Sequence, residues 1–214
     1  MNVLDWLQAP AFTSFGAPTS RIELIGFITG ALCVYLVARQ NVWNWPIGIA
    51  NNIAFVALFL TAGLYADSGL QIVYVALGVW GWYRWTARRE AAPHSVTGTS
   101  PTEWFWLIAA GVSATAVLTY LLTVGTESTV PFFDAVTTAL SLVATWGQAR
   151  KRWESWVLWI IADVIYVPLY LYKGLTLTAL LYLGFIVLCV IGLREWRRDM
   201  AAGVAAATPS VATV

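Results

Sequence analysis

One acidic side chain stands in the middle of a strongly apolar run. Asp163 occurs in the string WIIADVIYV, and apart from the more peripheral Asp134 no other acid lies within such a run. A carboxylate in these surroundings costs several kcal/mol unless it is paired, protonated or hydrated, and no Lys or Arg is expected at its depth. Its partner is therefore a ligand or, alternatively, Asn52 or a hydroxyl on a neighbouring helix.

Amide and phenol side chains occupy two further apolar runs. Asn51 and Asn52 lie in one of them, and Gln71 and Tyr74 lie one helical turn apart in the next. Their donors and acceptors are unfavourable against lipid tails, so they should face a protein interior, where they would bind a polar ligand or bond one helix to another. The candidate substrate-binding residues are Asn51, Asn52, Gln71, Tyr74, Trp159, Asp163 and Tyr166, and the candidate gate residues are Asn44, Trp45 and Tyr170.

The elements that must position these residues are transmembrane helices. Of the 214 residues, 59% are hydrophobic and 11% are charged, against about 25% charged in soluble proteins. Apolar runs of about 20 residues are long enough to cross the hydrocarbon core as helices. We predict an all-α polytopic membrane protein with seven spans, at about residues 22–38, 43–61, 67–85, 104–123, 131–149, 156–172 and 175–193.

The basic residues favour one orientation of these spans. Cytoplasmic loops carry an excess of Lys and Arg. With the N-terminus outside, ten of the 12 basic residues fall on the inner side, and only Arg21 and Lys173 fall outside. We therefore predict a multi-pass protein of the inner or plasma membrane whose C-terminus is cytoplasmic. The basic residues fall between apolar segments and form no single basic face, which argues against a nucleic-acid partner.

The chain repeats itself at an offset of about 111 residues, with chance similarity between apolar sequences as the alternative. One connector span between two three-helix units gives both units the same orientation. The fold is then a 3+1+3 parallel repeat like that of SWEET sugar transporters, with the substrate between the halves near the middle of the membrane. Aligned pairs include Trp45 with Trp156, Gly63 with Gly174, Trp85 with Trp196, and Asn52 with Asp163.

The two ends of the chain lie outside this repeat. Around Phe12 and Phe15 we expect a short amphipathic element at the membrane interface, and we expect the Ala/Val/Thr tail to be disordered because it has little to pack against. The predicted parts are an N-terminal extracytoplasmic segment (1–21), the first repeat (22–86), a cytoplasmic loop (87–103), the connector helix (104–124), the second repeat (131–196) and a flexible cytoplasmic tail (197–214).

Neither a metal site nor another cofactor is expected. Cys33 and Cys189 lie inside predicted spans, and His94 is the only histidine. This set can build neither a zinc site nor a disulfide framework, and the thiols are interpreted as core-packing side chains. Because no predicted span contains a histidine and no metal ligands gather there, the sequence argues against an enzyme.

Three motifs resemble the PnuC family of vitamin-precursor transporters, and the resemblance covers about residues 22–198. They are WNWPIG and LYADSGLQIVY in the first repeat and WVLWIIADVIYVPLYLYKGLTLTALLY in the second. The resemblance implies facilitated diffusion of nicotinamide riboside, its trapping through phosphorylation by a cytoplasmic kinase, and a homotrimer. Relatives handle riboflavin or thiamine, but the LQ..Y string is more similar to the nicotinamide riboside branch. Proton coupling through Asp163 is a variant of this function.

Nicotinamide riboside carries a positively charged pyridinium ring, which fits the isolated acid. Asp163 would offset this charge, and aromatic faces would hold the ring through cation–π attraction of about 0.5–2 kcal/mol. Access would alternate by rocking one three-helix unit against the other. The aromatic candidates are Trp45, Tyr74, Trp80, Trp159, Tyr166 and Tyr170.

Overall fold

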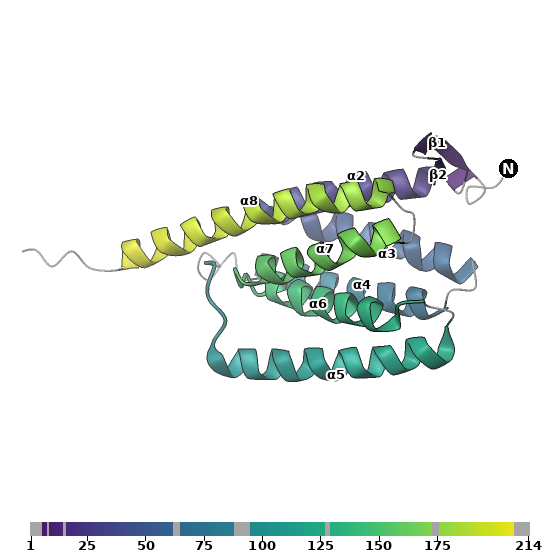
Figure 1. Ribbon diagram of the computed structural model, residues 1–214. Coiled ribbons are helices and arrows are strands. Elements are labelled where there is room, and N and C mark those ends of the chain that lie inside the picture. The colour runs from purple at the N-terminus through teal and green to yellow at the C-terminus, as the bar shows by residue number, and fades with distance from the viewer. Residues whose placement is uncertain are drawn as a thin grey trace, which may run out of the picture.

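Long helices that run side by side dominate the protein (Figure 1). The computed structural model describes residues 6–7, 9–14, 16–61, 65–87, 95–126, 129–172 and 176–207. Its labelled elements are β1 (Pro10–Ser14), β2 (Ala17–Ser20), α2 (Arg21–Ala38), α3 (Asn44–Thr61), α4 (Tyr65–Ala87), α5 (Pro101–Gly125), α6 (Pro131–Ala149), α7 (Ser155–Tyr172) and α8 (Thr176–Ala207). These seven long helices follow the seven predicted spans.

The segment before the first long helix is a β-hairpin, so the amphipathic element expected near Phe12 is wrong in its secondary structure. Strands β1 and β2 pair in antiparallel register. Pro10 and Pro18 disfavour a helix here, and Gly16 turns the chain with a φ of 82°, which a residue without a Cβ adopts at little cost. Phe12 is exposed, whereas Phe15 lies outside the described residues.

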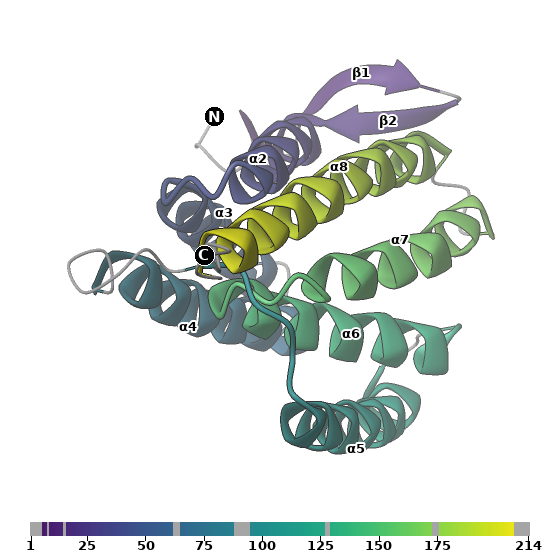
Figure 2. The ribbon, with the colours of Figure 1, turned by 90° about the vertical axis from the view of Figure 1, so that its left-hand side faces the viewer.

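Six helices form a closed ring, and α5 lies outside it. In chain contacts, α2 packs on α3, α3 on α4, α4 on α6, α6 on α7, α7 on α8, and α8 returns to α2. Figure 2 looks along the bundle and shows this ring, with α5 against α6 alone. No residue of α5 is buried. Helices α3 and α7 therefore stand on opposite sides of the ring, each held between two neighbours.

The ring has the two-fold pattern that the internal repeat predicts. Helices α2, α3 and α4 correspond to α6, α7 and α8, and each contact between neighbours has its counterpart, since α4 meets α6 where α8 meets α2. The two turns that follow α2 and α6 also match. Gln40 and Lys151, which are 111 residues apart, both have positive φ, of 50° and 53°, and the Lys151 Nζ donates to Gln40 Oε1 at 2.7 Å.

Four tryptophans form the largest part of the buried core, at the end of the ring where α2, α4 and α6 end. We call Trp45, Trp85, Trp156 and Trp196 the tryptophan layer. Trp45 meets Trp85 edge to face at 5.5 Å, and Trp156 meets Trp196 in the same way at 5.4 Å. Trp85 and Trp196 also touch each other across the repeats, with ring centroids 6.3 Å apart.

Each repeat donates one indole N–H to the other through this layer. Trp85 Nε1 donates to the carbonyl of Gln148 at 3.3 Å, and Trp196 Nε1 donates to the carbonyl of Val37 at 3.2 Å. Val37 and Gln148 are themselves 111 residues apart. The two hydrogen bonds are therefore the same bond made twice, and chance similarity does not explain the repeat.

The basic residues gather at the end of the ring that holds the tryptophan layer. Arg39, Arg84 and Arg150 lie near the ends of α2, α4 and α6, and Arg21 begins α2 next to the hairpin. We call these the basic end and the hairpin end. Lys173, Arg88 and Arg89 lie outside the described residues.

Three described helices are long and apolar enough to span a membrane by length and composition alone. They are α5, α7 and the Thr176–Ala205 part of α8, while α2 offers the shorter apolar stretch Leu24–Ala38. The remaining helices carry polar side chains such as Asn52 and Asp134, which lower their hydropathy. The polar residues that suggest a site thus also weaken the membrane signal of the helices that carry them.

Helix α8 continues past the predicted end of the seventh span, so the prediction of a flexible tail is wrong for residues 197–207. The extension projects beyond the other helices (Figure 1). It is held by contacts with the turn after α2: Glu195 Oε1 accepts from Arg39 at 3.3 Å, and Asp199 Oδ2 accepts from the Gln40 amide at 2.5 Å. Alanine-rich sequence also favours a helix. Residues 208–214 lie outside the description.

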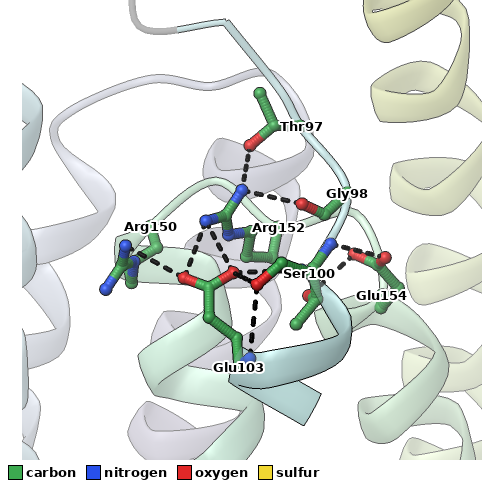
Figure 3. Close-up of polar contacts among 8 residues, drawn as sticks. Thr97, Gly98, Ser100, Glu103, Arg150, Arg152 and Glu154 are labelled. Atoms are coloured by element: carbon green, nitrogen blue, oxygen red, sulfur yellow. Dashed lines mark hydrogen bonds and ion pairs between the residues drawn. The ribbon is translucent and has the colours of Figure 1, made fainter.

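The end of the loop before α5 is fastened to the turn between α6 and α7. Arg152 donates to both carboxylate oxygens of Glu103 at 2.8 Å and to the carbonyl of Gly98 at 2.7 Å, and it also bonds Thr97. Figure 3 shows these groups converging on the Arg152 guanidinium. Arg150 adds an ion pair with Glu103 at 3.0 Å. The loop predicted for residues 87–103 is thus a bonded strap where the structure describes it.

The first turn of α5 has the sequence signature of a capped helix. Ser100 Oγ accepts the Glu103 N–H at 3.2 Å, and the Ser100 N–H donates to Glu103 Oε2 at 3.1 Å. This reciprocal pair is a capping box, with Pro101 at the first helical position. Glu103 therefore caps α5 and binds Arg152 with the same carboxylate, which fixes α5 to the second repeat.

Candidate functional site

Asp163 lies about halfway along α7 and is buried. Only 3% of the residue is exposed, and its Oδ2 accepts a long hydrogen bond of 3.8 Å from the Cys189 thiol on α8. No Lys or Arg of the described chain forms an ion pair with it. The bond to Asn52 that sequence reasoning left open does not form. A thiol is a weak donor, so the charge of this carboxylate is left without a strong partner.

Three tyrosines extend from Asp163 toward the hairpin end. Tyr166 and Tyr170 stack one turn apart on α7, with ring centroids 5.5 Å apart and planes 18° from parallel. Tyr182 on α8 contacts both, at 5.0 and 4.9 Å, and Phe185 lies 5.4 Å from Tyr182. The result is a continuous aromatic surface built from α7 and α8.

Tyr74 joins this surface from the first repeat. Its hydroxyl lies within hydrogen-bonding reach of Ser141 on α6 and close to Tyr166, and Tyr166 in turn lies within reach of Thr137 and Ser141. Helix α6 stands between α4 and α7 in the ring. Side chains from both neighbours can meet over α6 only on its inner side. We call Tyr74, Tyr166, Tyr170 and Tyr182 the tyrosine cluster.

The two α6 hydroxyls already have acceptors for their own protons. Ser141 Oγ donates to the carbonyl of Thr137 at 2.8 Å, and Thr137 Oγ1 donates to the carbonyl of Phe133 at 2.8 Å. Each hydroxyl oxygen therefore acts as an acceptor toward a neighbouring phenol. This arrangement orients the hydroxyls of Tyr74 and Tyr166.

Acidic side chains flank the tyrosine cluster on two sides. Tyr170 lies close enough to Asp134 and to Asp163 to feel the charge of both carboxylates. Asp134 sits in the first turn of α6, toward the hairpin end, and it has other interactions of its own. Aromatic faces between two carboxylates favour a cationic ring through cation–π and charge attraction.

The amide candidates lie elsewhere on the ring. Asn52 aligns with Asp163 but projects from α3, on the opposite side, and Asn51 precedes it. Both are half-buried, as is Gln71 on α4. Among the described residues none of the three amides has a side-chain hydrogen-bond partner. At the position that Cys189 holds in the second repeat the first repeat has Gly78, so Asn52 lacks the thiol that Asp163 has.

The remaining candidates divide between the two ends. Trp159 packs against the core around the tryptophan layer, and its buried Nε1 has no partner. Of the gate candidates, Trp45 belongs to that layer, and Asn44 is buried beside it, with its amide donating to the Asn41 carbonyl at 2.7 Å. Tyr170 lies in the tyrosine cluster at the other end. The structure thus brings together Tyr74, Tyr166, Tyr170 and Asp163, but not the amides or tryptophans.

The described residues contain no group of His, Cys, Asp or Glu side chains that could hold a metal ion. Cys33 and Cys189 are free thiols.

A family profile matches nearly the whole helical part of this chain. The profile is that of the nicotinamide mononucleotide transporters, and it covers residues 20–198, which include the ring and α5. The chain belongs to this transporter family. Its members are not enzymes, so this protein is a multi-pass membrane transporter of the PnuC type for a small vitamin precursor.

Relatives within the nicotinamide mononucleotide transporter family differ in substrate. The riboflavin/roseoflavin transporter RibM of Streptomyces davaonensis is 27% identical over 204 residues, which cover 92% of this chain and 95% of RibM. The nicotinamide riboside transporter PnuC of Escherichia coli is 28% identical over 207 residues, covering 85% and 87%. The crystal structure of the vitamin B3 transporter PnuC is similar in fold, with a TM-score of 0.66, 24% identity, and coverage of 85% and 82%.

Sequence reasoning missed four members of the site of this family member. Cys189 was interpreted as a packing thiol, although it bonds Asp163. Tyr182 aligns with Gln71 at the offset of 111 residues, so the repeat alone pointed to it. Thr137 and Ser141 carried no signal, because hydroxyl residues inside a membrane helix commonly bond their own backbone.

Proposed function

We propose that this transporter takes up nicotinamide riboside by facilitated diffusion. The observation that carries the proposal is the buried carboxylate of Asp163, which has a thiol and no cation as its partner. A cationic pyridinium ring would supply the missing positive charge, and the tyrosine cluster offers aromatic faces beside it. The family relationship to nicotinamide riboside transporters agrees with this choice.

Riboflavin is the second candidate substrate, because RibM aligns along almost its entire length with this chain. Its flat ring would stack on the tyrosine cluster, but it is neutral and leaves Asp163 without a counter-charge. Thiamine carries a cationic ring and provides a third test ligand. Charge therefore separates the candidates more sharply than shape does.

Transport in this proposal uses the two-fold arrangement of the ring. The basic end faces the cytoplasm, and the two repeats rock about a substrate between them. Asn51, Asn52 and Gln71 bind ribose or carboxamide groups from the first repeat. Access is controlled by Trp45 and Asn44 at the basic end and by Tyr170 at the hairpin end. A cytoplasmic kinase that traps the product and a homotrimeric assembly complete the proposal.

Direct binding to purified protein tests the substrate. Nicotinamide riboside, thiamine and riboflavin would be titrated in parallel by calorimetry in detergent. Tighter binding of nicotinamide riboside than of riboflavin is expected. If riboflavin alone binds, the charge argument fails and the protein is assigned to riboflavin uptake.

The variant Asp163→Asn tests the role of the carboxylate. Losing an ionic partner should weaken binding of nicotinamide riboside about 10- to 100-fold, as expected for hydrogen bonds and contacts to charged groups. Glu195→Gln removes one negative charge from the basic end, where Glu195 pairs with Arg39, and serves as the matched control. Equal affinity of Asp163→Asn and the unmodified protein would remove the carboxylate from the mechanism.

Uptake into proteoliposomes distinguishes facilitated diffusion from proton coupling. With facilitated diffusion, substrate equilibrates and an imposed pH gradient does not produce accumulation. Accumulation above the external concentration, driven by an inward proton gradient and lost in Asp163→Asn, would instead establish coupling through this carboxylate.

A further inference from the structure

Two contacts of the second repeat have apolar counterparts in the first. Within the second repeat, Thr137 on α6 lies beside the hydroxyl of Tyr166 on α7. Subtracting 111 gives Gly26 on α2 and Phe55 on α3. These two are also neighbours, since a Cβ at Gly26 would lie 3.1 Å from the Phe55 ring. The contact is conserved between the repeats while the hydroxyl groups are lost from it.

The contacts between the repeats show the same change. Tyr74 on α4 approaches Ser141 on α6. At the aligned positions Phe185 on α8 approaches Gly30 on α2, where a Cβ would lie 3.5 Å from the Phe185 ring. A phenol again becomes a phenyl ring, and a hydroxyl residue again becomes glycine. Both changes make α6 the polar helix and α2 the apolar one.

These paired changes are consistent with the cost of unsatisfied hydroxyls. A buried phenol without a partner loses about 1–3 kcal/mol, so a tyrosine beside glycine would be unfavourable where a phenylalanine is not. Thr137 and Ser141 satisfy their own protons on the α6 backbone, so the helix gains little from them. Their remaining function is to accept from Tyr166 and Tyr74. The α6 side therefore presents fixed oxygen atoms, and the α2 side presents carbon.

We infer that the substrate lies between these two sides in one orientation, with its hydroxyl-bearing chain against α6 and its flat ring against α2, Phe55 and Phe185. Thr137 and Ser141 are positioning residues that orient the phenols of Tyr166 and Tyr74. This orientation rests on the proposed uptake of a ring-and-polyol vitamin precursor. It applies equally to a riboside and to a flavin with its ribityl chain.

Ligands without the hydroxyl chain test the orientation. 1-Methylnicotinamide keeps the pyridinium cation of nicotinamide riboside and lacks ribose, and lumiflavin keeps the flavin ring and lacks the ribityl chain. Tyr166→Phe should weaken binding of the complete ligand about three- to tenfold, as for the loss of one neutral hydrogen bond. It should leave binding of the ring-only ligand unchanged. Tyr120→Phe, on the exposed face of α5, is the matched control and should change neither.

The apolar side predicts the opposite pattern. Phe55→Tyr places a phenol against Gly26, which offers no hydroxyl partner. It should weaken binding of the complete and the ring-only ligand by the same factor, because the ring contacts this side. The melting temperature of each variant without ligand shows whether it is folded.

The positioning role has its own readout. Thr137→Val should weaken binding of the complete ligand as Tyr166→Phe does, and the double variant should be no weaker than the stronger single variant, since both act through one phenol. Additive losses, or equal losses for complete and ring-only ligands in Tyr166→Phe, would overturn the inference. So would failure of both ring-only ligands to bind the unmodified protein. The riboflavin and lumiflavin pair giving the expected pattern alone would keep the orientation and reject nicotinamide riboside as substrate.

Discussion

Replacing Gly192 by alanine should destabilise the tryptophan layer. A Cβ at this position would lie 2.5–2.7 Å from three atoms of the Trp156 ring, whereas carbon atoms in good contact are about 3.5–4.0 Å apart. The ring would have to move by about 1 Å. It has no room to do so, because Trp156 is 0% exposed and its neighbour Trp196 lies edge to face at 5.4 Å.

The magnitude follows from two opposing effects. Overpacking a well-packed core costs about 1–3 kcal/mol, while alanine in place of glycine favours a helix by about 0.5–1 kcal/mol. The net destabilisation is therefore about 1–2 kcal/mol. For a chain of this size it corresponds to a melting temperature lower by about 2–8 °C.

Thermal unfolding of the purified protein in detergent, followed by intrinsic tryptophan fluorescence, measures this difference. Gly184→Ala is the matched control, because it lies on the same helix and a Cβ there meets nothing within 4 Å. It should leave the melting temperature unchanged or raise it. If Gly192→Ala and Gly184→Ala shift the melting temperature by the same amount and in the same direction, the close packing of Trp156 against α8 is refuted.

Three further predictions concern the repeat and the strap. Gly81→Ala should lower the melting temperature as Gly192→Ala does, because its Cβ would lie 2.6 Å from Cζ2 and Cζ3 of Trp45; an increase would contradict the two-fold packing. Arg152→Lys loses the two-oxygen contact with Glu103, so hydrogen exchange should accelerate at the Thr97 amide, and unchanged protection would exclude a role of the guanidinium. Ser100→Ala removes the α5 cap, worth about 1 kcal/mol, and should accelerate exchange in the first turn of α5 while leaving its last turn unaffected.

Much of the architecture could be predicted without coordinates. Spans of about 20 apolar residues mark helices because their backbone must be satisfied inside the membrane. The offset of 111 residues also predicted the pairing of Trp45 with Trp156, which occupy matching places in the tryptophan layer. The hairpin at residues 10–20 and the long C-terminal helix were not predicted, because turn geometry and contacts with Gln40 decide them.

The candidate site was predictable only in part. The isolated acid Asp163 and the phenols of Tyr74 and Tyr166 stand out because polar groups are rare in apolar runs. Their partners did not stand out, since Cys189 and Ser141 are ordinary residues of membrane helices. Which side chains meet depends on which helices are neighbours, and periodicity within one helix does not contain that information.

The sequence by itself determined that the protein is a helical, membrane-spanning pair of repeats with one buried acid, because hydrophobicity and self-similarity are properties of the chain. Only the tertiary structure decided that α6 follows α4 around the ring, which brings Ser141 to Tyr74, and that α3 stands opposite α7, which separates Asn52 from Asp163. The physical reason is that helices pack through side chains on several faces at once. The neighbours of each face are settled by closing the whole ring.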